Sequence, residues 1–155
     1  MTYETDLGLL AKQAAEIIRE EPWYAAALSN ISALIAETLA DLNWAGFYLL
    51  RGGVLNVGPF QGKPACIHIR PGKGVCGTAM ERDETVVVPD VHLFPGHIAC
   101  DSASQSEIVV PIHAKGKVIG VLDIDSPSLN RFSETEKETL EALVRTIEEG
   151  VRWED

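Results

Sequence analysis

Three cysteines are the residues of this sequence best suited to chemistry. Cys66, Cys76 and Cys100 cannot all pair with one another, and a reducing cytosol does not favour structural disulfides. Each is therefore a buried thiol, a metal ligand or a redox-active thiol, and burial is the common case for a free cysteine. The residues around each cysteine have to decide between these alternatives.

Cys100 lies in a long predicted loop, residues 89–105, shortly after His97. A cysteine in a loop can be exposed, and a nearby imidazole or backbone N–H group can lower the pKa of its thiol. Loops of this length within one domain are typically functional or mobile. Cys100 is therefore the candidate attacking sulfur, and a cysteine that only anchors the loop is an alternative of equal weight.

Cys66 and Cys76 lie in or beside connections that contain glycine and proline. Such segments allow the close approach that a disulfide needs, so both cysteines are candidate partners of Cys100. Cys76 can instead lie on the first turn of a short helix predicted from Val75 to Arg82, packed against the sheet. This structural alternative is stronger for Cys76 than for Cys66.

A zinc site is the competing explanation of the same region. His68, His92 and His97 accompany the cysteines, and thiolate and imidazole are preferred zinc ligands. However, none of these residues shows the Cys-x-x-Cys or His-x-x-x-His spacing that is typical of zinc sites. We therefore expect no metal and no bound cofactor.

Three carboxylates on a predicted hairpin could supply acid–base chemistry. Asp123 and Asp125 are two residues apart on one strand, so their side chains project from the same face. If the hairpin turns at residues 115–116, Glu107 on the partner strand pairs with Ile124, beside both aspartates. Mutual repulsion would raise the pKa of at least one acid, which could then act as a general acid, while the others bind an ammonium group. An exposed acidic hairpin is the alternative.

Trp44 and Tyr48 are four residues apart on another predicted strand and therefore share a face. Aromatic residues in a strand usually belong to the core. Here they are equally suited to form the wall of a pocket for an apolar or cationic group.

Periodicity predicts the elements that must position these side chains. Apolar residues at helical spacing indicate helices over residues 7–18 and 22–39, with Pro22 in the first turn of the second. A hairpin over residues 44–60, a short strand over 67–69, a short helix over 75–82 and a second short strand over 85–88 follow. After the long loop come a second hairpin over 106–125 and a capped final helix over 133–151. We expect one α+β domain, residues 1–155, in which N- and C-terminal helices flank a central antiparallel sheet.

Composition excludes several classes of function. The net charge of −10 argues against nucleic acid as a partner, because a surface that binds phosphates is rich in Lys and Arg. The apolar runs are too short to cross a membrane, and the acidic N-terminus lacks the features of a signal peptide, so we expect a cytoplasmic protein. The sequence leaves a homodimer open, with the exposed terminal helices as its candidate contacts.

Several segments resemble the GAF-domain family. They are Gly72–Ala79, Val86–Val91, Ser106–Ile112 and Gly120–Ser126. Within that superfamily, Gly58–Cys66, His97–Glu107 and the Asp123/Asp125 pair resemble the free methionine-(R)-sulfoxide reductases more specifically. The resemblance runs from about Leu9 into the final helix.

The resemblance implies a GAF-like fold and a thiol-dependent reductase of free methionine-(R)-sulfoxide. It implies that Cys100 attacks the sulfoxide sulfur and becomes a sulfenic acid, that Cys66 then forms a disulfide with it, and that thioredoxin reduces this disulfide. Cys76 matches the family's third cysteine. Glu107, Asp123 and Asp125 match its acidic ligand-binding residues, with Glu107 and Asp125 as candidate proton donors, and Trp44 and Tyr48 match its aromatic wall. The alternatives are a non-catalytic GAF module that binds a small ligand and a thiol redox sensor.

Overall fold

The structure is a computed structural model that describes residues 2–98 and 100–154. Ala99, in the predicted loop, and both terminal residues lie outside the described residues. The helices are α1 (Tyr3–Glu20), α2 (Tyr24–Thr38), α3 (Gly74–Arg82), the short 3-10 helix η1 (Val91–Leu93) and α4 (Glu134–Gly150). The strands are β1 (Trp44–Arg51), β2 (Val54–Gly62), β3 (His68–Ile69), β4 (Val86–Val88), β5 (Ser106–Ala114) and β6 (Lys117–Ser126). This order confirms the predicted succession of elements.

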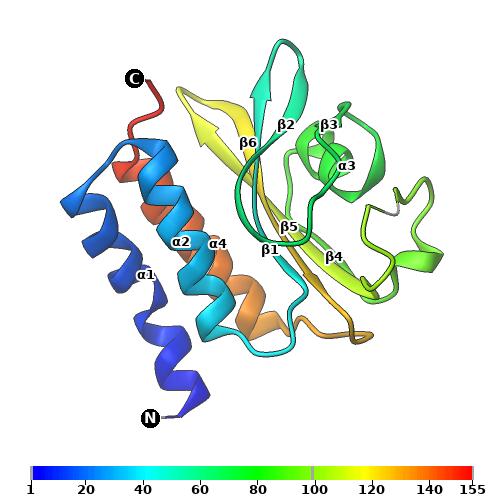
Figure 1. Ribbon diagram of the computed structural model, residues 1–155, viewed down its shortest axis with the longest axis horizontal. Helices are drawn as coiled ribbons and strands as arrows, with labels where there is room; N and C mark the ends of the chain where they lie inside the picture. The colour runs from blue at the N-terminus through cyan, green and yellow to red at the C-terminus, as the bar shows by residue number, and fades with distance from the viewer. Residues whose placement is uncertain (1, 99, 155) are drawn as a thin grey trace.

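One antiparallel sheet with the strand order β3-β2-β1-β6-β5-β4 runs through the middle of the molecule. Figure 1 shows α1, α2 and α4 together on one face of this sheet, and α3 with the long loops on the other. The predicted α+β domain with a central antiparallel sheet is therefore confirmed, and its terminal helices lie together on one face of that sheet. None of the described helices is both long enough and apolar enough to span a membrane.

Each face of the sheet has its own core, because side chains alternate along a strand. The core on the helical side takes alternate residues of the central strands, among them Phe47, Ile108, Val110, Leu122 and Ile124. The core on the opposite side, beneath α3, contains Trp44, Tyr48, Val75, Cys76, Ala79, Val109 and Val121. Polar side chains on that second face of β5 and β6 are consequently held below a covering layer and away from bulk water.

A bulge between Ile112 and His113 corrects the predicted register of the second hairpin. Without it, Glu107 would pair with Ile124 and would point to the helical face. The bulge shifts the pairing by one residue, so Glu107 lies opposite Asp125, and Ile108 lies opposite Ile124. A shift of one residue exchanges the two faces of a strand. The bulge is therefore what brings all three acids to one face.

Pro22 is the second correction. It precedes the N-cap, Trp23, and α2 begins at Tyr24, so Pro22 does not lie in the first helical turn. The reason is a contact with the C-terminal segment: the Arg152 N–H donates to Pro22 O (2.7 Å), and the Tyr24 N–H donates to Arg152 O (2.9 Å). This bridge holds Pro22 and Trp23 beside Arg152, so the helix begins only at Tyr24.

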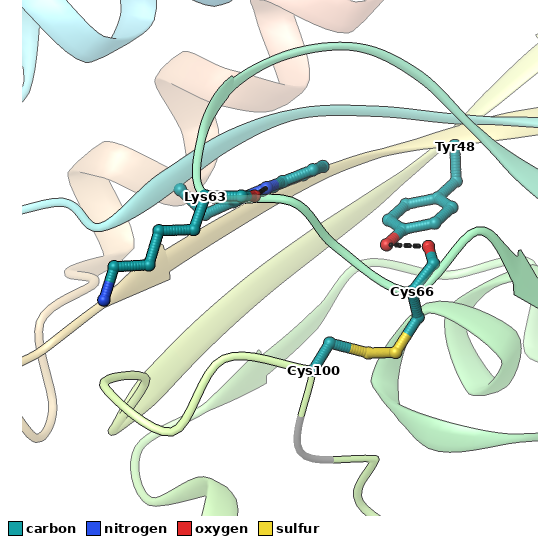
Figure 2. The surroundings of a disulfide bond; sticks show 5 residues. Tyr48, Lys63, Cys66 and Cys100 are labelled. Carbon is teal, nitrogen blue, oxygen red and sulfur yellow. Dashed lines mark hydrogen bonds between the residues drawn. A yellow bond between two sulfur atoms is a disulfide. The ribbon is translucent and has the colours of Figure 1, made fainter.

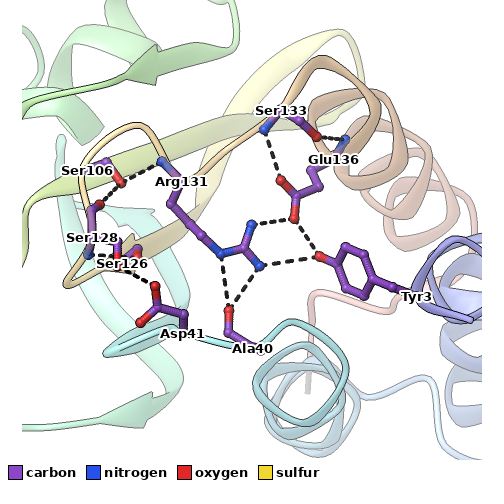
Figure 3. Close-up of polar contacts among 9 residues, drawn as sticks. All are labelled: Tyr3, Ala40, Asp41, Ser106, Ser126, Ser128, Arg131, Ser133 and Glu136. Atoms are coloured by element: carbon purple, nitrogen blue, oxygen red, sulfur yellow. Dashed lines mark hydrogen bonds and ion pairs between the residues drawn. The ribbon is translucent and has the colours of Figure 1, made fainter.

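A polar network at the end of β6 joins the helical layer to the strands that carry the acids (Figure 3). Arg131 contacts Glu136 in the first turn of α4, donates through Nη2 to Ala40 O (2.9 Å) and reaches the Tyr3 hydroxyl (3.3 Å) in α1. The Ser106 hydroxyl at the start of β5 donates to Ser128 O (2.6 Å). The network thus positions α1, α2 and α4 relative to the strand ends that precede Glu107 and follow Asp125.

Candidate active site

A disulfide joins Cys66 to Cys100 across 34 residues of sequence, with the two Cα atoms 5.5 Å apart. This is the pairing implied by the family resemblance. Figure 2 shows the bond linking the segment after β2 to the long loop before β5. Cys76 is a free, buried thiol in the first turn of α3, which is the structural alternative that the sequence favoured for this residue.

Two aromatic side chains of β1 hold the segment that carries Cys66. The Tyr48 hydroxyl donates a hydrogen bond to Cys66 O (2.9 Å), and Trp44 Nε1–H donates to Lys63 O (3.2 Å). Figure 2 shows Tyr48 directed at the Cys66 backbone. Trp44 and Tyr48 are both buried and stack with ring centroids 5.7 Å apart, which confirms that they share one face of the strand. Tyr48 therefore holds the Cys66 backbone directly, and Trp44 holds the same segment three residues earlier, at Lys63.

The three acids lie side by side under this segment. Glu107 on β5 is directly opposite Asp125 on β6, and Asp123 lies one pair further along. Only 7% of Glu107 and 5% of Asp123 is exposed to solvent. Cys76 joins them from α3, because its sulfur, a Glu107 oxygen and an Asp123 oxygen lie within 4.8 Å of one another. This is a buried cluster, so the exposed acidic hairpin considered from the sequence is wrong.

Burial and mutual repulsion set the protonation of the cluster. Burial raises the pKa of Glu107 well above its ordinary value, and the charges of Asp123 and Asp125 raise it further. Burial also raises the pKa of Asp125 well above its usual range, with the charge of Asp123 adding to the effect. The pKa of Asp123 rises less, since Glu107, Cys76 and Asp125 donate hydrogen bonds that oppose its burial. Asp123 is therefore the acid that keeps its charge most easily.

Two of these carboxylates have an oxygen that no protein group satisfies. Asp123 Oδ1 and Asp125 Oδ1 are buried and have no hydrogen-bond partner among the described residues. Buried polar atoms are usually paired, so unpaired acceptors in a concave site indicate the place of an absent donor. An ammonium group offers three N–H donors and a positive charge, which suits these oxygens.

A pocket between the sheet and the covering loops connects these features. It is lined by Trp44, Tyr48, Pro64, Ala65, Ile69, Gly74, Val75, Cys76, His97, Ile98, Cys100, Asp101, Ser104, Glu107, Asp123 and Asp125. Seven of the eight residues singled out in the sequence thus line one pocket, and Cys66 joins it through the disulfide. Tyr48 cannot serve as a proton donor that ionises, because burial and the charge of Asp123 raise the pKa of its phenol far above the ordinary value.

Some residues of the site escaped the sequence-based prediction. Asn43 donates through Nδ2 to Asp101 Oδ2 and to Ser104 Oγ, both at 3.0 Å, and so ties the start of β1 to the end of the long loop. Phe60 of β2 stacks on Trp44 with ring centroids 5.0 Å apart. Phe60 and Ser104 lie within the segments that resemble the family, but the sequence assigned them no role, and Asn43 lies outside those segments.

His97 lines the pocket but does not provide a fixed positive charge at neutral pH. Burial lowers the pKa of its imidazole, and the charge of His92 lowers it further, although Asp123 acts in the opposite direction. A mostly neutral imidazole stabilises a thiolate less than a cation does. The backbone N–H groups of the loop, rather than His97, therefore remain as the candidate activators of the Cys100 thiol.

Comparison with known proteins agrees with this fold. The GAF domain model matches residues 25–151. The free methionine-R-sulfoxide reductase of Escherichia coli is 53% identical over 135 residues, which cover 87% of this chain and 82% of that protein. The structure of fRMsr of Staphylococcus aureus in its reduced form superimposes with a TM-score of 0.91 at 56% identity, covering 94% of this chain and 95% of the other.

A third similar protein, the free methionine-R-sulfoxide reductase from Neisseria meningitidis in complex with its substrate, has a TM-score of 0.92 at 40% identity. It covers 96% of this chain, and this chain covers 90% of it. The chain therefore belongs to the GAF-domain family. Within that family it groups with the free methionine-R-sulfoxide reductases, as the resemblance in its motifs implied.

Proposed function

We propose that this protein is a thiol-dependent reductase that converts free L-methionine-(R)-sulfoxide to methionine. The observation that carries the proposal is the Cys66–Cys100 disulfide beside a pocket that contains three buried acids and two aromatic rings. The names of similar proteins support the same substrate. The disulfide form corresponds to the enzyme after one round of reduction.

The reaction begins with attack of Cys100 Sγ on the sulfoxide sulfur. This attack forms a bond between the two sulfur atoms. The protonated oxygen then passes to Cys100 Sγ as the S–O bond and the new S–S bond break, so methionine leaves and Cys100 becomes a sulfenic acid. An oxide is a very poor leaving group, so the oxygen must accept a proton as the bond weakens. Glu107 or Asp125, held protonated by burial, is placed to donate it.

Cys66 completes the cycle within the protein. Its sulfur displaces the hydroxyl of the Cys100 sulfenic acid, so that water leaves and the disulfide forms. Thioredoxin then returns both residues to thiols by dithiol exchange, its own two thiols becoming a disulfide. Thioredoxin recycling requires a reducing compartment, which agrees with the expected cytoplasmic location.

The acids also explain a preference for a free amino acid. Asp123, the acid most easily ionised, and the unpaired oxygens of Asp123 and Asp125 would hold the ammonium group of the substrate. Trp44 would contact its apolar S-methyl end. A methionine within a peptide has no ammonium group, and it would leave the buried carboxylate oxygens unpaired, which is costly.

The decisive experiment couples turnover to NADPH oxidation through thioredoxin reductase and thioredoxin, with separated R and S isomers of free methionine sulfoxide. We expect turnover with the R isomer. Absence of turnover with the R isomer, or equal turnover with both isomers, would contradict the proposal. Disulfide formation by peroxide without any turnover would instead indicate a redox-sensing module.

Single-turnover measurements separate the roles of the cysteines. Cys100→Ser should release no methionine, whereas Cys66→Ser should release one equivalent per chain and then stop. Cys76→Ser should still form the Cys66–Cys100 disulfide. Failure of Cys66→Ser to release that one equivalent would overturn the assignment of Cys66 as the resolving cysteine.

A further inference from the structure

Cys76 has no step in the proposed reaction, yet it is part of a cluster with the geometry of a metal site. Its sulfur lies within 4.8 Å of both a Glu107 oxygen and an Asp123 oxygen, and all three residues are buried. Cysteine sulfur and carboxylate oxygen are both ligands of tetrahedral zinc, and some zinc sites use three protein ligands and leave the fourth position open, as the pocket would here. The cluster comes from three different elements, α3, β5 and β6, which hold its members in place.

A second observation points to a missing cation. Only 5% of Asp123 is exposed to solvent, and its Oδ1 has no hydrogen-bond partner among the described residues. Asp125 Oδ1 is likewise buried and unpaired on the same side of β6. A divalent ion stabilises buried oxygens that lack donors, and it displaces the protons of the carboxyls and of the thiol that coordinate it.

We infer that Cys76, Glu107 and Asp123 bind a thiophilic divalent ion such as Zn²⁺, and that this ion excludes the substrate. The sulfur ligand determines the class of ion, because thiolate selects zinc-like ions over Mg²⁺ and Ca²⁺, which prefer oxygen ligands alone. The ion is not a cofactor of the proposed reaction. It would occupy the carboxylates that the ammonium group of the substrate needs, so it acts as an inhibitor.

The oxidised protein offers a clean test, because Cys76 is then the remaining thiol of the three cysteines. Co²⁺ is added to the disulfide form, and the sulfur-to-cobalt charge-transfer absorption is followed, a signal that requires a cobalt–thiolate bond. We expect saturation at one equivalent of Co²⁺, loss of the signal when Zn²⁺ is added, and no effect of excess Mg²⁺. Absence of the band in the disulfide form would overturn the inference.

Variants identify the ligands. Cys76→Ser should abolish the band, and Asp123→Asn and Glu107→Gln should each weaken Co²⁺ binding at least about tenfold. Glu16→Gln, which changes an exposed carboxylate of α1, should leave the affinity unchanged and is the matched control. A band that persists in Cys76→Ser, or that weakens equally in Glu16→Gln, would place the ion elsewhere.

The exclusion of substrate rests on the proposed function and has its own readout. Free methionine should lower the apparent affinity for Co²⁺ in the oxidised protein, since its ammonium group competes for Asp123. If Co²⁺ binds through Cys76 and methionine has no effect, the metal site stands and the competition is wrong. If neither the Co²⁺ band nor methionine competition is seen while the R isomer is still reduced, the metal site is wrong and the proposed function stands.

Discussion

The three neighbouring acids of the site differ in how far their pKa values rise, because each has different hydrogen-bond partners. Glu107 is opposite Asp125, and burial together with the charges of both aspartates raises its pKa well above the ordinary value. Asp123 accepts from Glu107, Cys76 and Asp125, so it is the last to be protonated. The cluster therefore places a carboxyl that keeps its proton readily beside one that ionises more readily, which is what the proposed proton donation and ammonium binding require.

The raised pKa of Glu107 makes stability depend on pH. A carboxyl whose pKa is higher in the folded than in the unfolded state stabilises the fold below the unfolded pKa, and this stabilisation is lost as the pH rises through the folded pKa. We therefore expect the free energy of unfolding to fall from about pH 5 upward, by at most about 1.4 kcal/mol per pH unit for one group.

Glu107→Gln should remove this part of the pH dependence, which urea unfolding at a series of pH values would measure. His113, whose pKa is raised by Asp83 and Glu148 despite burial, contributes a loss of the same sign, so the comparison must be between the variant and the unchanged protein. Parallel pH profiles for the two proteins would show that Glu107 ionises alike in the folded and unfolded states.

Asp123→Asn tests the binding role separately from the chemistry. We expect KM for free methionine-(R)-sulfoxide to rise roughly 10- to 100-fold with a smaller change in kcat, because a charged hydrogen bond contributes about 1.5–3 kcal/mol. Asp90→Asn is the control. Asp90 precedes η1 as its N-cap and does not line the pocket, so KM should not change. A fall in kcat at unchanged KM would assign Asp123 to the chemical step instead.

The strands position the pocket through close backbone approach, and β1 shows this most clearly. Gly46 lies between Trp44 and Tyr48 on the face of the strand that carries the site, and it pairs with Phe60 of the neighbouring strand β2. An added Cβ at Gly46 would lie 2.2 Å from Phe60 Cβ and 2.8 Å from Pro59 O. A side chain therefore cannot be accommodated here without moving β2 and the ring of Phe60, which stacks on Trp44.

Gly46→Ala should lower the free energy of unfolding by about 1–3 kcal/mol, since overpacking forces the backbone to shift. It should also raise KM, because Trp44 and Phe60 move together. Gly8→Ala is the matched control: it lies on α1 with no atom within 4 Å of an added Cβ, so it should stabilise the helix by about 0.5–1 kcal/mol. Thermal or urea unfolding measures both changes. Equal changes in the free energy of unfolding for Gly46→Ala and Gly8→Ala would contradict the packing argument.

At the scale of the whole molecule, the helical layer acts as a support for a sheet whose other face carries the site. Arg131 is central to this support, because it connects α1, the end of α2 and the start of α4 (Figure 3). Burial alone would raise the pKa of Glu136, but hydrogen bonds from Arg131, the Ser133 backbone and Tyr3 outweigh it and hold the pKa below its ordinary value. The buried carboxylate is thus stable only while its partners remain.

Breaking a buried ion pair costs roughly 3–5 kcal/mol of the free energy of unfolding. We expect Arg131→Leu to lower the free energy of unfolding by an amount near the lower end of this range. The double variant Arg131→Leu/Glu136→Gln should recover more than half of that loss, because glutamine keeps the capping box with Ser133 and removes the unpaired charge. Urea unfolding of both variants gives the comparison.

The pH dependence of this pair is opposite to that of Glu107. The lowered pKa of Glu136 contributes stability above the unfolded pKa, and that stability is lost as the pH falls through the folded pKa. Arg131→Leu should therefore flatten the acid side of the stability profile. An unchanged acid limb in Arg131→Leu would mean that the Arg131–Glu136 contact does not lower the pKa of Glu136.

Local patterns in the sequence determined the elements and much of the candidate site. Alternation predicts that Asp123 and Asp125 share a face, and that Trp44 and Tyr48 do so, since side-chain direction along a strand depends only on the strand itself. The helical period and the Ser133–Glu136 capping box likewise predict α4, because these interactions span a single turn.

Only the tertiary structure decided how these pieces meet. The bulge after Ile112 sets which face Glu107 occupies, and the bridge from Arg152 displaces the start of α2 past Pro22, because each depends on a partner strand or segment. The positions of the cysteines left both Cys66 and Cys76 open as partners of Cys100, and only the resemblance implied Cys66. The structure gives the physical reason, because Tyr48 holds the Cys66 backbone and α3 buries Cys76. Pairing between distant residues is fixed by packing in three dimensions, and a pattern read along one segment cannot specify it.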